Sequence, residues 1–83
     1  MDMFYNENIV GQCVGRFRCQ RGWTQEELAV KMQLLGCYMT RDMIAKIESC
    51  HLYITDKQIM YFAEVFDVEA DELFPQNRPD ELN

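Results

Sequence analysis

Several features that mark common protein classes are scarce or missing in this 83-residue sequence. It has one histidine, two prolines and no Cys-x-x-Cys pair. It has no run of about 20 apolar residues, the length that a membrane-spanning helix needs. The first eight residues carry Asp2 and Glu7 and lack a basic segment followed by an apolar one, so they do not read as a secretory signal. These absences predict a cytoplasmic protein that does not contact a membrane.

The cysteine pattern does not favour a metal site or disulfides. The four cysteines have no paired spacing, and the only histidine, His51, stands beside Cys50. A reducing cytoplasm disfavours bridges, and a free cysteine behaves as a small hydrophobe. We therefore interpret them as buried or half-buried free thiols, with a zinc site as the alternative: Cys13, Cys19, Cys37 and Cys50.

Catalysis is not favoured either. The sequence contains no glycine-rich phosphate loop and no nucleophile beside a base. We expect no enzymatic activity, no cofactor and no small-molecule substrate.

The sequence does contain an ordinary globular balance of residues, 48% hydrophobic and 27% charged, in a chain long enough for one domain. The net charge of −6 is unevenly distributed. Residues 9–57 hold seven basic and five acidic residues, a balance of +2, whereas residues 58–83 hold one basic and seven acidic residues, a balance of −6. A small core supplies only a few kcal/mol of net stability, so we expect a homodimer.

The apolar pattern predicts helices throughout. The first begins near Asn8, and its glycines Gly11 and Gly15, four residues apart, indicate a closely packed neighbour. This helix ends in a turn at Gly22. The run Thr24–Glu27 is a capping box that opens a second helix, which ends near Gln33.

The second half of the chain predicts three more helices. One begins at the N-cap Thr40 and ends near Ser49, and another follows a capping box from Thr55 to Gln58. A short fifth helix over 69–74 ends before a proline. We therefore predict an all-α domain over residues 9–74, preceded by an N-terminal arm (1–8) and followed by a flexible polar tail (75–83).

The paired threonine-capped helices are typical of a helix-turn-helix. The chain resembles the lambda-repressor-like family, which includes the Cro and xenobiotic-response-element type regulators, over about residues 9–74. The positions that carry the resemblance are Gly11, Arg18, Gly22-Trp23-Thr24-Gln25-Glu26-Glu27-Leu28-Ala29, Ile44, Ile47-Glu48, Ala63, Val68 and Leu73. It implies a five-helix DNA-binding domain whose third helix reads bases of double-stranded DNA.

The outward face of that third helix is the candidate base-reading surface. Each residue turns an α-helix by about 100°, so Ile44 and Ile47 facing inward direct the opposite face to solvent. A helix in the major groove needs donors, acceptors and a small residue there. The candidate base contacts are Thr40, Arg41, Asp42, Ala45 and Lys46.

The resemblance also implies contacts beyond the bases. Gln25 matches a glutamine that contacts phosphate and braces the recognition helix, and Arg18 and Glu48 match an internal ion pair. The remaining candidate phosphate contacts are Arg16, Arg21, Ser49, His51 and Tyr53.

The chain departs from the family in three places. The connection from the second to the third helix is about five residues longer than the usual turn of three to four. Cys50 replaces a glycine after the third helix, and Asp67 and Glu69 replace a glycine and a small capping residue before the fifth.

Two functions remain open. The first is a transcriptional repressor that binds a two-fold operator as a homodimer, associating through Tyr61, Phe66 and Phe74. The second is a protein-interaction module of the same fold, such as an antitoxin-like partner, which the overall acidity and Asp42 favour.

Overall fold

The computed structural model describes the backbone of residues 3–74 and the side chains of residues 10–74. Over this range the chain is all-helical, without a strand, and its elements are α1 (Met3–Gln20), α2 (Gln25–Leu34), α3 (Arg41–Glu48), α4 (Asp56–Phe66) and the 3-10 helix η1 (Ala70–Leu73). The predicted all-α class is confirmed. In the described part of the chain, no helix is both long enough and apolar enough to cross a membrane.

The predicted fifth helix is only a single 3-10 turn of four residues. Glu69 precedes it and makes no capping hydrogen bond with its own side chain, as expected for a poor N-cap. Instead the backbone N–H of Glu69 donates to the Glu72 carboxylate at 2.9 Å. The described residues therefore form four α-helices, where five helices were predicted.

Three helices begin where their threonine caps predict. The hydroxyls of Thr24 and Thr55 accept the third backbone N–H of α2 and α4, and the reciprocal bonds from Glu27 and Gln58 complete both capping boxes. Thr40 caps α3 by accepting the backbone N–H of Met43 at 3.1 Å. These local bonds satisfy helix N–H groups that have no partner within the helix.

The start of α1 was predicted wrongly. The helix begins at Met3 rather than after Asn8, so most of the predicted arm is helical. No glycine or proline lies between Met3 and Val10 to stop the helix. The predicted tail, 75–83, lies outside the described residues.

All four α-helices end in the same backbone motif. After each helix one residue adopts a positive φ, and it and its successor donate N–H groups back to the last turn, as in a Schellman motif. Glycine fills this position after α1 and α2, but Cys50 (φ 66°) and Asp67 (φ 61°) fill it after α3 and α4. Cys50 and Asp67 thus hold a left-handed geometry that glycine adopts more readily.

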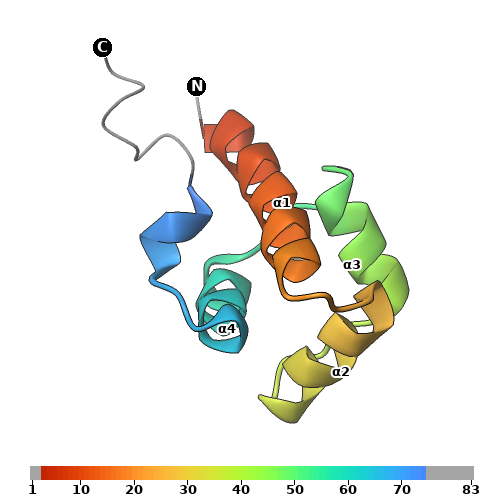
Figure 1. Ribbon diagram of the computed structural model, residues 1–83. Helices are drawn as coiled ribbons and strands as arrows, with labels where there is room; N and C mark the ends of the chain where they lie inside the picture. The colour runs from red at the N-terminus through yellow and green to blue at the C-terminus, as the bar shows by residue number, and fades with distance from the viewer. Residues whose placement is uncertain (1–2, 75–83) are drawn as a thin grey trace.

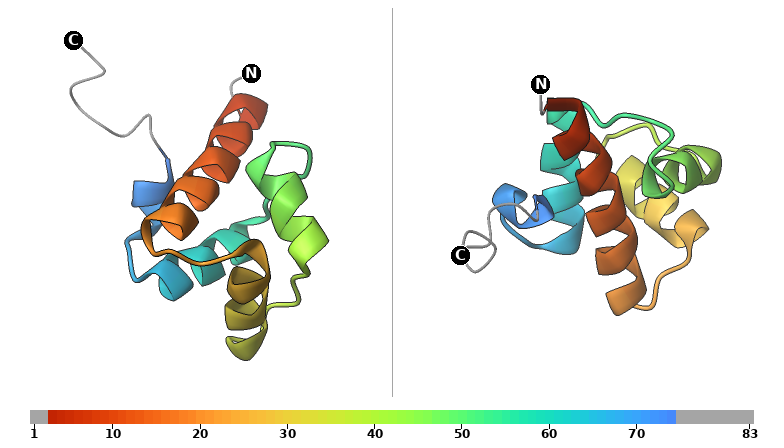
Figure 2. Two further views of the ribbon diagram at one scale, coloured as in Figure 1. Left: turned by 45° about the vertical axis from the view of Figure 1, so that its right-hand side comes forward. Right: turned by 90° about the horizontal axis from the view of Figure 1, so that it is seen from above.

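Helix α1 runs through the middle of the molecule, with α3 on one side and η1 on the other (Figure 1). Helix α2 packs on both α3 and α4. Figure 2 shows the same order from two further directions, with the α2–α3 connection leading from the far end of α2 to the start of α3. The core between the helices is closed by fully buried side chains such as Leu28, Ile44, Ile47 and Phe62.

The approach of α1 to α3 depends on Gly11. A β-carbon at this position would overlap the backbone carbonyl oxygen of Ile47, whereas one at Gly15 would meet the Glu48 side chain at an ordinary 3.4 Å. The predicted close packing against the two glycines is therefore present, and it brings the end of α3 against the middle of α1.

Phe66 cannot form part of the predicted self-association surface, because its side chain is fully buried. It packs among Phe17, Trp23 and Phe62 at ring-centroid distances of 5.5, 6.0 and 6.1 Å. Amphipathic spacing placed Phe66 on the apolar face of α4 but did not show that Phe17 of α1 and Trp23 of the α1–α2 turn cover it.

No disulfide joins the four cysteines, all of which lie among the residues with described side chains. Cys13 and Cys37 are buried and Cys50 is half-buried, as predicted, but Cys19 is exposed on α1. Burial raises the pKa of the Cys37 thiol.

Candidate nucleic-acid interface

The outward face of α3 carries the predicted base-reading side chains. Arg41, Asp42 and Lys46 are exposed, Ala45 is half-buried, and Ile44 and Ile47 are fully buried on the opposite side. The half-buried Thr40 caps the helix with its side chain. The structure thus gathers all five candidate base contacts on or beside one solvent-facing helix surface.

Two of these residues bind each other. The Lys46 ammonium lies 3.2 Å from the Asp42 carboxylate, one helical turn away, with side chains 58% and 76% exposed. An exposed pair at this spacing contributes only about 0.3–0.5 kcal/mol to stability. It does, however, place a carboxylate beside the Lys46 ammonium on the outward face. The i, i+4 spacing of Asp42 and Lys46 was the sequence signal for this pair, and sequence reasoning treated the two residues separately.

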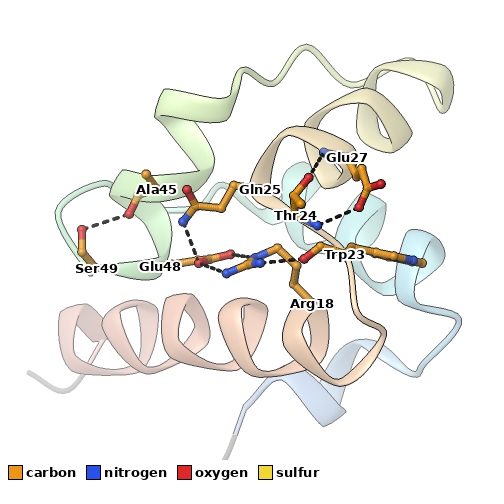
Figure 3. Close-up of polar contacts among 8 residues, drawn as sticks. All are labelled: Arg18, Trp23, Thr24, Gln25, Glu27, Ala45, Glu48 and Ser49. Atoms are coloured by element: carbon orange, nitrogen blue, oxygen red, sulfur yellow. Dashed lines mark hydrogen bonds and ion pairs between the residues drawn. The ribbon is translucent and has the colours of Figure 1, made fainter.

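The end of α3 is held by a cluster centred on Glu48 (Figure 3). The Arg18 guanidinium of α1 donates from Nε and Nη2 to the two carboxylate oxygens of Glu48, at 2.6 and 3.0 Å. A third Arg18 nitrogen donates to the Trp23 carbonyl oxygen at 2.7 Å, directly before α2. A bidentate arginine–carboxylate pair specifies both distance and orientation. One arginine therefore ties α1, the start of α2 and the end of α3 together.

The pair is largely shielded from solvent, with 15% of the Arg18 and 12% of the Glu48 side chain exposed. The hydrogen bond and the charge of Glu48 raise the pKa of Arg18, while burial opposes the rise. The guanidinium consequently stays charged across the whole accessible pH range. The arginine side of the pair is therefore permanently charged.

Gln25 joins the same cluster. Its side-chain amide donates to Glu48 Oε1 at 3.0 Å, so it braces α3 from the first position of α2. The bracing contact implied by the family resemblance is present in this chain. The contact of Gln25 with phosphate stays a prediction.

Ser49, His51 and Tyr53 lie after the candidate reading helix, and all three are exposed. The Ser49 hydroxyl donates to the Ala45 carbonyl oxygen at 3.0 Å and lies 2.9 Å from His51 Nδ1. The Ser49 hydroxyl therefore caps the last turn of α3 and already donates its proton within the protein. Contact of these three residues with phosphate stays a prediction.

The two remaining candidate phosphate contacts are directed to different places. The exposed Arg16 lies on α1, its guanidinium 3.4 Å from the Cys13 sulfur. Arg21 is half-buried, its guanidinium donating to the Phe66 carbonyl oxygen at the end of α4 and lying 5.4 Å from the Phe17 and Phe66 ring centroids. These Arg21 contacts join α1 to α4, a structural role that the sequence did not suggest.

The long connection between α2 and α3 is anchored to the rest of the protein by buried side chains. Met39 is fully buried and Cys37 is 7% exposed, so both anchor the connection in the core. The side-chain amide of Gln33 donates to the Met39 carbonyl oxygen. Gly36, at φ 100°, allows the tight exit from α2. The connection therefore fixes where α3 begins.

Comparison with known proteins adds no assignment: no family model, no curated protein and no solved structure matches the chain.

Proposed function

We propose that this protein is a transcriptional regulator that binds double-stranded DNA sequence-specifically, with α3 as its recognition helix. It acts as a homodimeric repressor in the cytoplasm and uses no cofactor. The observation that carries the proposal is the outward face of α3, where Arg41, Asp42, Ala45 and Lys46 stand together on a helix braced by the Arg18–Glu48 pair.

The chemistry of this face matches base recognition. Arginine donates two hydrogen bonds to guanine, a carboxylate accepts from the cytosine amino group, and a small residue allows close approach. Base reading also requires a helix held in one orientation, and the contacts of Glu48 with Arg18 and Gln25 supply it. The basic balance of residues 9–57, the part of the chain that holds α3, supports attraction to phosphate there.

In vitro selection from a random duplex library tests the proposal directly. We expect the wild-type protein to enrich a two-fold site whose half-sites lie about one helical turn apart. Affinity for that site should fall steeply with salt, and Lys46→Ala should flatten the slope of log affinity against log salt by about 0.9. Lys31→Ala is the charge-matched control, because Lys31 lies on α2, away from the outward face of α3, with its ammonium 4.6 Å from the Trp23 ring centroid. Absence of enrichment at low salt would reject the proposal.

The Asp42–Lys46 pair allows a second, opposite test. Asp42→Ala removes a carboxylate from the outward face and frees the Lys46 ammonium. We expect tighter binding to non-specific duplex DNA and weaker discrimination between selected and random sites, measured by competition binding. Weaker non-specific binding would contradict the placement of α3 against DNA.

The alternative function is a protein-interaction module with little DNA binding. The observation that favours it is an exposed apolar stretch on α2, where Val30 is 49% and Leu34 81% exposed beside a hollow lined by Trp23, Glu26, Glu27 and Lys31. Contiguous exposed apolar patches often mark partner-binding sites, whereas single exposed apolar residues are common on any surface. A salt-independent complex with a protein partner, together with no duplex enrichment, would support this function.

A further inference from the structure

The α2–α3 connection borders a surface hollow of about 380 Å³. Its lining comes from the connection, from α3 and from the first half of α4: Gly36, Cys37, Tyr38, Met43, Thr55, Lys57, Gln58 and Tyr61. None of these lining residues is acidic, although the chain as a whole carries a net charge of −6. The hollow on α2 is different, because two glutamates line it.

Tyr38 is held at the rim of this hollow by the buried residues on either side of it. Cys37 and Met39 point into the core, so the Tyr38 side chain between them is directed outward and is 74% exposed. An exposed tyrosine ring loses the free energy that its burial would contribute. Because the segment that carries it is anchored in the core, the ring does not gain backbone mobility in exchange. The tyrosine is thus presented to solvent in a defined place.

The hollow also carries a cation. Lys57 is exposed in the first turn of α4 and takes part in neither of the ion pairs found among the described residues. Among the described residues Lys57 therefore has no carboxylate within ion-pair distance, whereas Lys46 on α3 has Asp42. A hollow with a lysine, two tyrosines and no carboxylate is complementary to an anion flanked by apolar groups.

The hollow lies next to the candidate reading face. Met43 lines it from α3, and Met43 and Lys46 are three residues apart, which places them about 60° from each other around the helix axis. A duplex whose major groove holds the outward face of α3 would therefore have one sugar–phosphate backbone near Met43. Tyr38 and Lys57 line the same hollow as Met43. The sugar–phosphate backbone has the required chemistry, a phosphate anion beside apolar deoxyribose.

We propose that this hollow binds the DNA backbone that flanks the groove entered by α3, with Tyr38 packing on the sugar and Lys57 pairing with the phosphate. This inference rests on the proposed function. It makes the lengthened α2–α3 connection a part of the DNA-binding surface and Tyr38 a positioning residue for α3.

The test uses the duplex selected by the wild-type protein and measures its affinity across a salt series. Lys57→Gln should flatten the slope of log affinity against log salt by about 0.9, as expected for one lost phosphate contact. Tyr38→Ala should weaken binding about three- to tenfold and Tyr38→Phe less, because phenylalanine keeps the ring and loses only the hydroxyl. Lys31→Gln and Met60→Ala are matched controls outside the hollow, Met60 being 64% exposed on α4.

Phosphate-ethylation interference supplies a readout that altered folding would not produce. We expect interference at a flanking phosphate with the wild-type protein and its specific loss with Lys57→Gln. If the wild-type protein binds the duplex and the Tyr38 and Lys57 variants show the same affinity, salt slope and interference pattern, this inference is overturned and the proposed function stays intact. Failure of the wild-type protein to bind any duplex would overturn both.

Discussion

Glu48 is the residue through which three segments of the chain are joined. It accepts hydrogen bonds from Arg18 and Gln25 at the end of α3, in a site mostly closed to water. A carboxylate in this position is specified by its partners, since only an acceptor with two oxygens satisfies both donors. By contrast Asp42, on the outward face of the same helix, makes one exposed contact with Lys46.

Glu48→Ala should therefore lower the free energy of unfolding by about 3 kcal/mol, because it leaves the Arg18 charge partly buried and unpaired. Asp42→Ala, the control, should change it by less than about 0.5 kcal/mol, because its pair is solvent-exposed. Urea unfolding followed by circular dichroism measures both. Similar losses for the two variants would remove the structural assignment of Glu48.

The cysteines differ in reactivity for reasons visible at single residues. Cys19 is exposed, whereas Cys37 is buried and has a raised pKa, so less of its reactive thiolate forms at a given pH. Alkylation at pH 8 followed by mass spectrometry should modify Cys19 well before Cys37. Because folding raises the pKa of Cys37, its contribution to stability is present below the ordinary thiol pKa of about 8.5. That contribution to stability should be lost as pH rises through the raised pKa of Cys37 in the folded protein. Equal alkylation rates would contradict the burial of Cys37.

At the scale of the elements, the contact between α1 and α3 gives opposite predictions for two glycines in one helix. Gly11→Ala should destabilise the protein by about 1–3 kcal/mol, because the added methyl group overlaps the Ile47 carbonyl oxygen. Gly15→Ala should be neutral or add up to about 1 kcal/mol, because alanine favours the helix and the contact with Glu48 is ordinary. Thermal melts of the two variants compare them directly. A stabilising Gly11→Ala would show that α1 and α3 lie further apart.

The helix ends give another prediction at this scale. Asp67 occupies a left-handed backbone conformation after α4, which costs a non-glycine residue about 1–2 kcal/mol. Asp67→Gly should recover about 1 kcal/mol of stability, whereas Asp67→Val should lose stability because a β-branched side chain tolerates this conformation poorly. Chemical denaturation of the pair measures the difference. A destabilising glycine variant would indicate that the aspartate side chain contributes more than its backbone strain costs.

At the scale of the whole molecule, the separation of charge gives stability and binding opposite responses to salt. Acidic side chains concentrate on α4, η1 and the segment between them, at Glu64, Asp67, Glu69, Asp71 and Glu72. Screening reduces their mutual repulsion, so the melting temperature should rise between about 0.01 and 0.15 M salt. The affinity for duplex DNA should fall over the same range. A melting temperature that falls with salt would show that attractive surface pairs outweigh this repulsion.

The sequence by itself determined the order of the four α-helices and the starts of three of them. Threonine caps, capping boxes and apolar spacing are local signals, so the starts of α2, α3 and α4 followed from residues within one turn of each boundary. The inward direction of α3 followed from Ile44 and Ile47, which are fully buried. The weak fifth helix was recognisable from Glu69, whose side chain does not cap it.

Only the tertiary structure decided which side chains the helices bury and which contacts they make with one another. Phe66 has the spacing of a self-association residue, but Phe17 of α1 and Trp23 of the α1–α2 turn pack against it. Arg21, expected as a surface cation, contacts the end of α4. The long α2–α3 connection had no local signal for its path, because its shape depends on the core that receives Met39. Burial and ion pairing are set by segments distant in sequence, so local spacing cannot specify them.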